Sequence, residues 1–289
     1  MSKIRDKMSK SRLNLRKVVT IVACLAVTTM FQDCSKKEVN QPICTITAPA
    51  NNAEFLETEN IMVTVVTEAK SGSIAEIQLY VDNVEHSRAV SMKNFTILAG
   101  ELSAGPHTIK AIAINDQGAK GEATVNIIVI PLSVGMSYQG GKIAYIDATG
   151  RHGLIAAPTD LSNDIEEWWN GTFMVTGATG TAIGTGKSNT DKIVEVQGDG
   201  NYAAKLCKDL SLGGYNDWFL PSKDELNELY KNRDAIGGFH NMEHYWSSSE
   251  YHEYSNLYVW VQSFVLGGDG TQEYNGKNTT FKTRAVRYF

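Results

Sequence analysis

The first half of the chain alternates apolar and polar residues with a period of two, the spacing of a half-buried β-strand. In the run at 74–84, one face carries Ile77, Leu79 and Val81. Other β-branched or alternating runs, separated by turn residues, lie at 61–66, 107–114 and 123–130. Short strands at this spacing, without a helical period, predict an all-β sandwich over residues 44–131.

From residue 132 onward, strand-like segments mix with helical spacing, so we expect an α+β domain over residues 132–289. A hairpin is predicted at 140–158 and a helix at 201–210. The glycine- and threonine-rich stretch 171–200 is typical of a long irregular segment. Further strands are expected at 245–248, 257–266, 271–274 and 281–289. The second of these is apolar on both faces, which predicts a central, covered strand.

A further helix is predicted to begin at Ser222. The residues from Ser222 to Glu225 form a capping box, in which the serine accepts from a first-turn amide while the glutamate reaches back to the serine N–H. The apolar stripe of this helix is predicted to comprise Leu226, Leu229 and Tyr230.

The N-terminus is typical of an export signal over residues 1–33. A basic region ends at Lys17, and the apolar run at 18–30 is too short for a membrane span of about 20 residues. Cys34 then stands where a cleavage site belongs. This arrangement resembles the lipoprotein signals of Bacteroidetes-type bacteria, although Asp33 replaces the usual small residue.

The resemblance implies that Cys34 becomes a lipidated N-terminus and that residues 34–43 form a tether. Cys24 is the rival lipidation site, because the residues before it fit the usual lipobox better, but the apolar run before it is too short. A simple secretory signal or an N-terminal anchor is the other alternative. The implied location is the cell envelope, as an outer-membrane lipoprotein that is surface-exposed or faces the periplasm.

The net charge of the chain disfavours some classes of binding partner. The formal net charge is −5, but the predicted signal holds 7 Lys or Arg and 2 Asp. Without it, 27 less 7 leaves 20 basic residues and 32 less 2 leaves 30 acidic ones, a net charge of −10. Nucleic acid is not an expected partner, because a surface this acidic repels phosphate backbones. Bulk attraction to sulfated polysaccharides is disfavoured for the same reason.

Two sets of motifs carry family resemblances. The first set lies at 213–222 (GGYNDWFLPS), 245–249 (YWSSS) and 283–287 (TRAVR). Through them, residues 140–289 resemble the Lcl C-terminal domain family, also called DUF1566, which implies a C-type-lectin-like fold with two helices, a small twisted sheet and long loops. Phe219 stands where the family usually has Arg, and Ala285 where it often has Cys. The second set lies at 79–82 (LYVD), 102–108 (LSAGPHT) and 111–118 (AIAINDQG), and it resembles bacterial Ig-like spacer domains.

We interpret the polar and aromatic positions of the first set of motifs as structural. Large aromatics beside apolar runs normally bury, so core packing is favoured over sugar stacking for the tryptophans. The structural signature comprises Trp218, Pro221, Ser222, Glu225, Trp246 and Arg284.

Better candidates for ligand binding lie in the loop at 250–256, where three rings stand among acidic and amide groups. The candidate binding residues are Tyr251, His252, Tyr254, Asn256 and Asp269. Asp269 and Glu273 are also candidate calcium ligands, although two carboxylates are weak evidence for a site. No cofactor is otherwise expected.

The string His240-x-x-Glu243-His244 spells an inverted zinc-protease motif. That chemistry needs both histidines one helical turn apart, whereas here a glycine pair precedes the string and a predicted strand follows it. A zinc hydrolase is therefore only a remote alternative.

These patterns together predict a non-enzymatic lipoprotein of the cell envelope that acts as a binding or adhesion module. Its expected partner is a glycan or an extracellular or envelope protein, with the membrane reached through the lipid. The alternative is a structural component of a surface or fimbria-like assembly.

Overall fold

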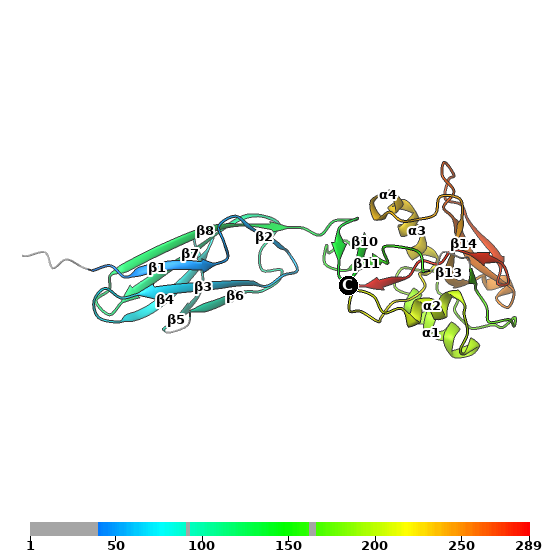
Figure 1. The fold of residues 1–289 in the computed structure, drawn as a ribbon, viewed down its shortest axis with the longest axis horizontal. Coiled ribbons are helices and arrows are strands. Elements are labelled where there is room, and N and C mark those ends of the chain that lie inside the picture. The colour runs from blue at the N-terminus through cyan, green and yellow to red at the C-terminus, as the bar shows by residue number, and fades with distance from the viewer. Residues whose placement is uncertain (1–39, 91–92, 162–165) are drawn as a thin grey trace, which may run out of the picture. The chain divides into compact units, whose positions relative to one another are not determined.

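The computed structural model describes residues 40–90, 93–161 and 166–289 (Figure 1). The predicted signal over residues 1–33, the candidate lipidation sites Cys24 and Cys34, and residues 34–39 of the predicted tether lie outside the described residues. In the part of the chain that is described, no helix has the length and apolar character needed to cross a bilayer.

The N-terminal domain is an all-β sandwich of two sheets. One sheet has the order β1 (Ile43–Ala48), β3 (Ile61–Glu68) and β6 (Asn94–Ile97). The other has the order β2 (Ala53–Leu56), β8 (Lys120–Ile130), β7 (Gly105–Asn115), β4 (Ile74–Val81) and β5 (Val84–Ala89). The side chains that alternate toward the space between the sheets form one buried apolar cluster.

The alternation in β4 confirms the predicted inward face, because Ile77, Leu79 and Val81 are all buried. Asp82 and Asn83 adopt positive φ angles of 50° and 67° and join β4 to β5, which suits the two-residue turn of a hairpin. The strand β5 itself had no apolar alternation to reveal it, because it is a mostly exposed edge strand.

The C-terminal domain is α+β. A four-stranded sheet has the order β17 (Val286–Tyr288), β11 (Gly153–Ala156), β10 (Gly141–Ile146) and β9 (Ser137–Tyr138). Two smaller sheets pair β12 (Glu166–Glu167) with β16 (Thr280–Phe281), and β13 (His244–Glu250) with β14 (Tyr258–Ser263) and β15 (Gln272–Gly276). The helices are α1 (Gly186–Gln197), α2 (Ala203–Asp209), α3 (Lys223–Lys231), α4 (Arg233–Ile236) and the 3₁₀ turn η1 (His252–Tyr254).

The expectation of an irregular segment over 171–200 was wrong, because α1 occupies its second half. The buried face of α1 has helical spacing but is formed by Gly186, Asn189, Thr190 and Ile193. Buried Asn189 donates from Nδ2 to the Gly180 carbonyl at 2.6 Å, so the polar part of this face is satisfied by hydrogen bonds, while Ile193 packs in the apolar core. A search for apolar periodicity therefore missed this helix.

The expected strand at 281–289 was also wrong as a single element, because β16 and β17 are separated by residues 282–285. In this interval the carbonyls of Thr283 and Ala285 accept from the amides of Leu161 and Ala157, which lie outside any strand. The interruption brings the buried side chain of Arg284 into the interior.

The strand predicted to be central is confirmed, since β14 lies between β13 and β15. Its inner face, with Val259 and Val261, packs into the core beside Trp246. Its outer face is covered only in part, because Gln262 is buried and donates to Asn227 of α3 at 2.9 Å while Tyr258 and Trp260 are half-buried. That face carries aromatic rings, as described below.

Candidate functional site

The outer face of β14 places two aromatic side chains in line. Tyr258 and Trp260 are two residues apart and therefore point to the same side of the sheet, opposite to Val259 and Val261. The register of the sheet sets Trp260 directly against Tyr274 of β15. Cross-strand neighbours on one face lie close enough for their side chains to touch.

The loop after β13 folds back onto this face. The amide of Tyr251 donates to the Tyr258 carbonyl at 2.9 Å, and the short η1 turn follows. The Tyr251 ring stacks on that of Tyr274, with 4.3 Å between centroids and 18° between planes, and meets Trp260 edge-on at 5.3 Å. Tyr254 packs edge-on against Tyr258 at 6.1 Å. We call the set Tyr251, Tyr254, Tyr258, Trp260 and Tyr274 the aromatic platform.

Two rings of the aromatic platform remain open to solvent. Tyr254 is 54% exposed and Tyr274 is 49% exposed, whereas large aromatic side chains are usually buried. Tyr251 donates from its hydroxyl to Glu253 at 3.2 Å, and desolvation together with this carboxylate raises the pKa of the tyrosine. The platform is therefore an apolar surface edged by hydroxyl and carboxylate groups.

A buried ion pair lies at the base of the loop at 250–256, which we call the tyrosine loop. Lys277, which follows β15, donates from Nζ to Glu250 Oε1 at 2.6 Å, and both side chains are inaccessible to solvent. The same ammonium donates to the carbonyls of Met174 at 2.6 Å and Ser255 at 2.7 Å. Glu250 in turn accepts from the amide of Thr176 at 2.9 Å and from the next amide at 3.1 Å. The pair thus ties the tyrosine loop to the segment at 174–177.

Desolvation lowers the pKa of Lys277, and Glu250 opposes that shift by favouring the ammonium. All three ammonium protons have an acceptor, which is the condition under which a buried charge is tolerated. The ammonium also lies 4.5 Å from the ring centroid of Trp168. The geometry supports a fixed conformation for the loop that carries Tyr251 and Tyr254.

The sequence-derived binding residues divide between two places. Tyr251 and Tyr254 belong to the aromatic platform, and His252 and Asn256 are exposed beside them. Asp269 lies in a separate turn, where its carboxylate accepts from the Thr271 amide at 3.0 Å. Its candidate calcium partner Glu273 instead contacts His244 at 3.2 Å, so each carboxylate has its own partner.

Three residues of the aromatic platform were missed: Tyr258, Trp260 and Tyr274. The two on β14 were visible as aromatic residues in alternate positions, but they were assigned to a covered strand. Tyr274 lies 14 residues beyond Trp260, and only the strand register brings the two together.

The signature residues lie in the interior. Trp218 and Trp246 are buried, and Pro221 is buried between Trp218 and the start of α3. Ser222 and Glu225 form the predicted capping box, with the Ser222 amide donating to Glu225 Oε2 at 2.7 Å. In this fold the two tryptophans have no face open for sugar stacking.

Arg284 is held by a complete set of acceptors. Its Nε donates to Asp160 Oδ1 at 2.8 Å and its Nη1 to the Ala157 carbonyl at 2.9 Å, while Nη2 donates to the Gly238 carbonyl. The guanidinium also lies 4.1 Å from the centroid of Phe239. These contacts join the interval before β17 to two distant loops, which is a structural role.

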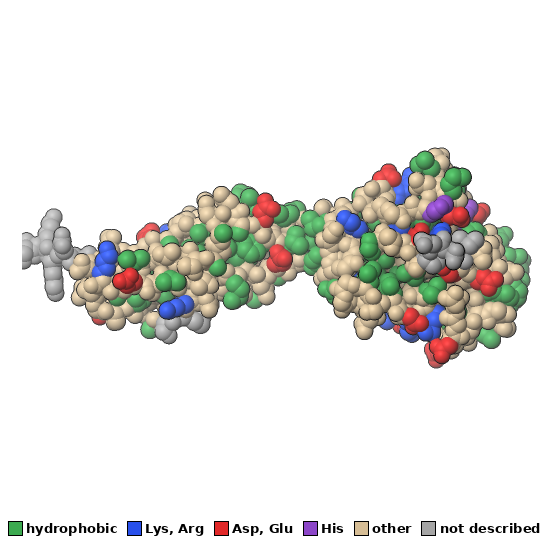
Figure 2. All heavy atoms as spheres, in the orientation of Figure 1, with side chains coloured by type: hydrophobic (Ala, Val, Ile, Leu, Met, Phe, Trp, Pro, Cys, Tyr) green, Lys and Arg blue, Asp and Glu red, His purple; other side chains and the backbone are tan. Residues whose placement is uncertain are grey.

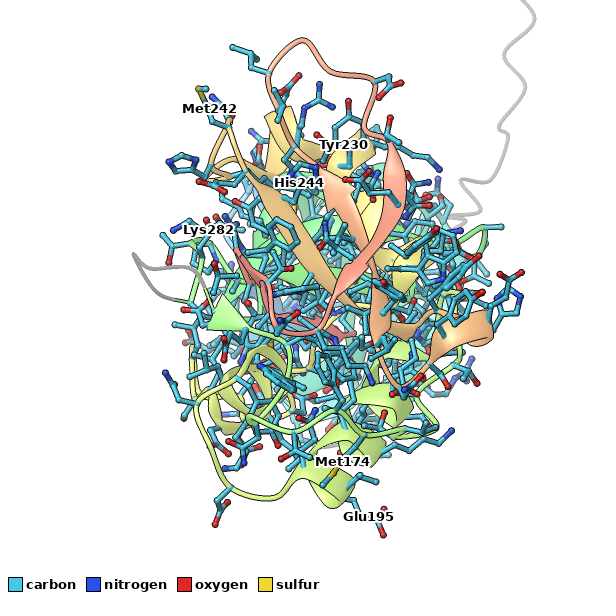
Figure 3. All side chains as sticks on the ribbon, turned by 90° about the vertical axis from the view of Figure 1, so that its right-hand side faces the viewer. Met174, Glu195, Tyr230, Met242, His244 and Lys282 are labelled. Atoms are coloured by element: carbon cyan, nitrogen blue, oxygen red, sulfur yellow. The ribbon has the colours of Figure 1, made fainter. Side chains whose placement is uncertain are left out.

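The structure does not support the zinc-hydrolase alternative. His240 lies in a loop and His244 begins β13, so the two imidazoles are not on one helical turn. Figure 3 shows Met242 out on the intervening loop while His244 lies on the sheet. In the described residues, no group of three or more His, Cys, Asp or Glu side chains is arranged to hold a metal ion.

A separate pocket of about 300 Å³ lies away from the aromatic platform. Its lining is mostly apolar and includes Tyr145, Leu154, Ile183, Tyr288 and Phe289. No residue of the aromatic platform lines this pocket.

Comparison with protein families identifies both domains. Residues 42–111 match the bacterial Ig domain and residues 170–287 match the Lcl C-terminal domain. Both resemblances stated from sequence motifs are confirmed. An Ig-like domain followed by this second domain is compatible with a binding or adhesion role.

Similar solved structures include the fibronectin(III)-like modules of Clostridium thermocellum CbhA, at 22% identity and a TM-score of 0.29, covering 32% of this chain and 47% of that one. Another is Bacteroides ovatus SGBP-B in complex with a mixed-linkage heptasaccharide, at 20% identity and a TM-score of 0.26, covering 44% of this chain and 34% of that one. A third is a bacterial ice-binding adhesin, at 10% identity and a TM-score of 0.25, covering 45% of this chain and 48% of that one. The chain spans less than half of each of these proteins. A comparison with curated proteins finds no match.

Proposed function

The chain carries a bacterial Ig domain followed by a domain of the Lcl C-terminal family, and from this premise we propose that it is a non-enzymatic envelope protein that binds glycan. The binding surface is the aromatic platform. The observation that carries the proposal is the exposure of Tyr254 and Tyr274, at about half of each side chain, on a face already lined by three other rings.

Rings of this kind suit sugars because a pyranose presents an apolar C–H face that stacks on an aromatic face, while its hydroxyls need polar neighbours. Tyrosine supplies both, with a large rigid ring that loses little conformational entropy on binding. Glu253 and the tyrosine hydroxyls stand at the edge of the platform to receive the sugar hydroxyls.

The expected affinity is modest. Covering the open half of each ring removes about 80 Å² from water, which contributes about 2 kcal/mol per ring at about 25 cal/mol per Å². Two rings then supply about 4 kcal/mol, which corresponds to a Kd of about 1 mM before any hydrogen bond is counted. Useful adhesion at this affinity requires many copies of the protein on one surface, where multivalency raises the avidity.

A cell-envelope location fits this requirement. We infer that the predicted export signal delivers the protein to the outer membrane as a lipoprotein anchored at Cys34. The Ig-like domain then acts as a spacer between the anchor and the binding domain. A lipid anchor would display many copies side by side.

The test uses isothermal titration calorimetry with soluble polysaccharides chosen from a glycan array. Tyr274→Ala and Tyr254→Ala are each expected to weaken binding about tenfold or more, because each removes about 2 kcal/mol of ring burial. Phe173→Ala is the matched control, because Phe173 is similarly exposed at 41% but is not part of the aromatic platform. Equal losses in all three variants, or an absence of glycan binding in the wild type, would refute the proposal.

A structural role in a surface assembly is the second candidate, and a specific observation favours it. Phe173, Met174 and Val175 are three consecutive apolar residues, each more than a third exposed. Exposed apolar strips of this kind are typical of protein–protein interfaces. If Phe173→Ala changed the oligomeric state in sedimentation experiments while glycan binding was absent, the assembly role would replace the glycan role.

A further inference from the structure

One lysine side chain contacts a ring of the aromatic platform. Lys223 is the first residue of α3, and its Nζ lies 3.7 Å from the ring centroid of Trp260. Its backbone is fixed on two sides, because its amide donates to Ser249 Oγ at 3.0 Å and its carbonyl accepts from Gln272 Nε2 at 2.8 Å. The backbone of Lys223 is therefore anchored to the ends of β13 and β15.

This ammonium has no acidic partner among the residues that the structure describes; the cation–π contact is its only recorded side-chain interaction. Three acidic residues on neighbouring segments have other recorded partners. Glu253 accepts from the Tyr251 hydroxyl, Glu273 pairs with His244, and Glu228 pairs with Lys231 at 2.7 Å. A cation over a ring is attracted to it but keeps N–H donors available for an anion.

Resting on the glycan-binding role proposed above, we propose that the aromatic platform is specific for glycans that carry carboxylate groups, such as uronic acids, and that Lys223 is the specificity-determining residue. The pyranose ring stacks on Tyr274 or Tyr254 while its carboxylate accepts from the ammonium of Lys223. Both interactions are available on one face because Trp260 contacts Lys223 and lies opposite Tyr274 in the sheet.

The rest of the surface limits the charge density of the ligand. Without the predicted signal the chain has a net charge of −10, and on the face drawn in Figure 2 the Lys and Arg side chains are scattered among Asp and Glu. Long-range attraction to a densely sulfated chain is therefore absent. A polymer with isolated carboxylates needs only one local cation, which is what the platform supplies.

The experiment compares three soluble uronic-acid polymers, hyaluronan, polygalacturonate and glucuronoxylan, with their carboxyl-reduced forms. Reduction converts each uronic acid to the neutral sugar and keeps the linkages. For at least one pair, the acidic form is expected to bind about five- to tenfold more tightly in 50 mM NaCl, and the ratio is expected to shrink in 500 mM NaCl.

Lys223→Gln is expected to reduce that ratio to about one by weakening binding of the acidic form, and Lys223→Arg is expected to retain the ratio. Lys231→Gln is the control on the same helix, because Lys231 is paired with Glu228 outside the platform. Circular dichroism and thermal melts of each variant confirm folding.

Three results would overturn the inference. Neutral and acidic forms that bind equally would remove the carboxylate specificity while leaving the glycan role intact. A ratio unchanged in Lys223→Gln would assign the specificity to another residue. Binding to neither form of any polymer, nor to any glycan on an array, would reject the glycan role and the inference with it.

Discussion

Replacing Lys277 by methionine should destabilise the C-terminal domain strongly and loosen the aromatic platform. Methionine keeps most of the volume of the lysine stem but removes the ammonium. Glu250 is then left as a buried carboxylate with two backbone donors, from Thr176 and the next residue, and without its counter-charge. The carbonyls of Met174 and Ser255 also lose their donor.

The magnitude follows from these contacts. Breaking a buried ion pair by removing one partner costs about 3–5 kcal/mol, because an uncompensated charge remains. The two backbone donors that stay with Glu250 place the expected loss at the lower end, about 3 kcal/mol. For a domain of this size that corresponds to a Tm lower by about 10 °C.

The assay is urea unfolding followed by tryptophan fluorescence, together with calorimetric melts. Trp168 and Trp246 are buried and report on the C-terminal domain. Lys187→Met is the matched control, because Lys187 pairs with Asp191 on the exposed side of α1 and should cost no more than about 0.5 kcal/mol.

A double-mutant cycle decides whether the ion pair itself is responsible. Lys277→Met combined with Glu250→Gln should be much less destabilised than the sum of the single variants, with a coupling energy of about 1–3 kcal/mol. Strict additivity, or a loss below about 0.5 kcal/mol in Lys277→Met, would refute the reasoning. Glycan affinity should fall in Lys277→Met even where the domain remains folded, since the Ser255 carbonyl is released.

Two further predictions concern the Ig-like domain and the N-terminus. His107 lies between two acceptors, with Nδ1 2.6 Å from Asp82 and Nε2 2.7 Å from the Ser103 carbonyl; burial opposes the charged imidazole, but these hydrogen bonds raise its pKa above the ordinary 6.5. The stabilisation of the folded Ig-like domain by protonated His107 is therefore complete below pH 6.5 and is lost as the pH rises through the folded-state pKa. The free energy of unfolding should fall by about 0.5 kcal/mol after solvent screening, which chemical denaturation at pH 5.5 and 8.5 would measure. This pH dependence should disappear in His107→Gln. At the N-terminus, Cys34→Ala should abolish incorporation of radiolabelled palmitate while Cys24→Ala leaves it unchanged, and the reverse result would assign lipidation to Cys24.

Local sequence patterns predicted the parts of the fold that depend on neighbouring residues. The alternation at 74–84, the Asp82-Asn83 turn and the capping box at Ser222 each involve residues only a few positions apart, and each has its expected form. The helix α1 escaped prediction because most of its buried positions are not apolar: Asn189 and Thr190 are satisfied by hydrogen bonds to distant carbonyls, and Ile193 is the large apolar residue among them.

By itself, the sequence determined an Ig-like sandwich followed by an α+β domain, and it directed attention to the tyrosines of the loop after β13. Only the tertiary structure decided what those tyrosines are part of. Tyr274 joins them through the register of β14 with β15. Lys223, at the start of α3, contacts Trp260, and Lys277 donates to the Ser255 carbonyl of the loop. These contacts join positions far apart in the chain, and their geometry depends on strand pairing and burial that no short window of sequence contains.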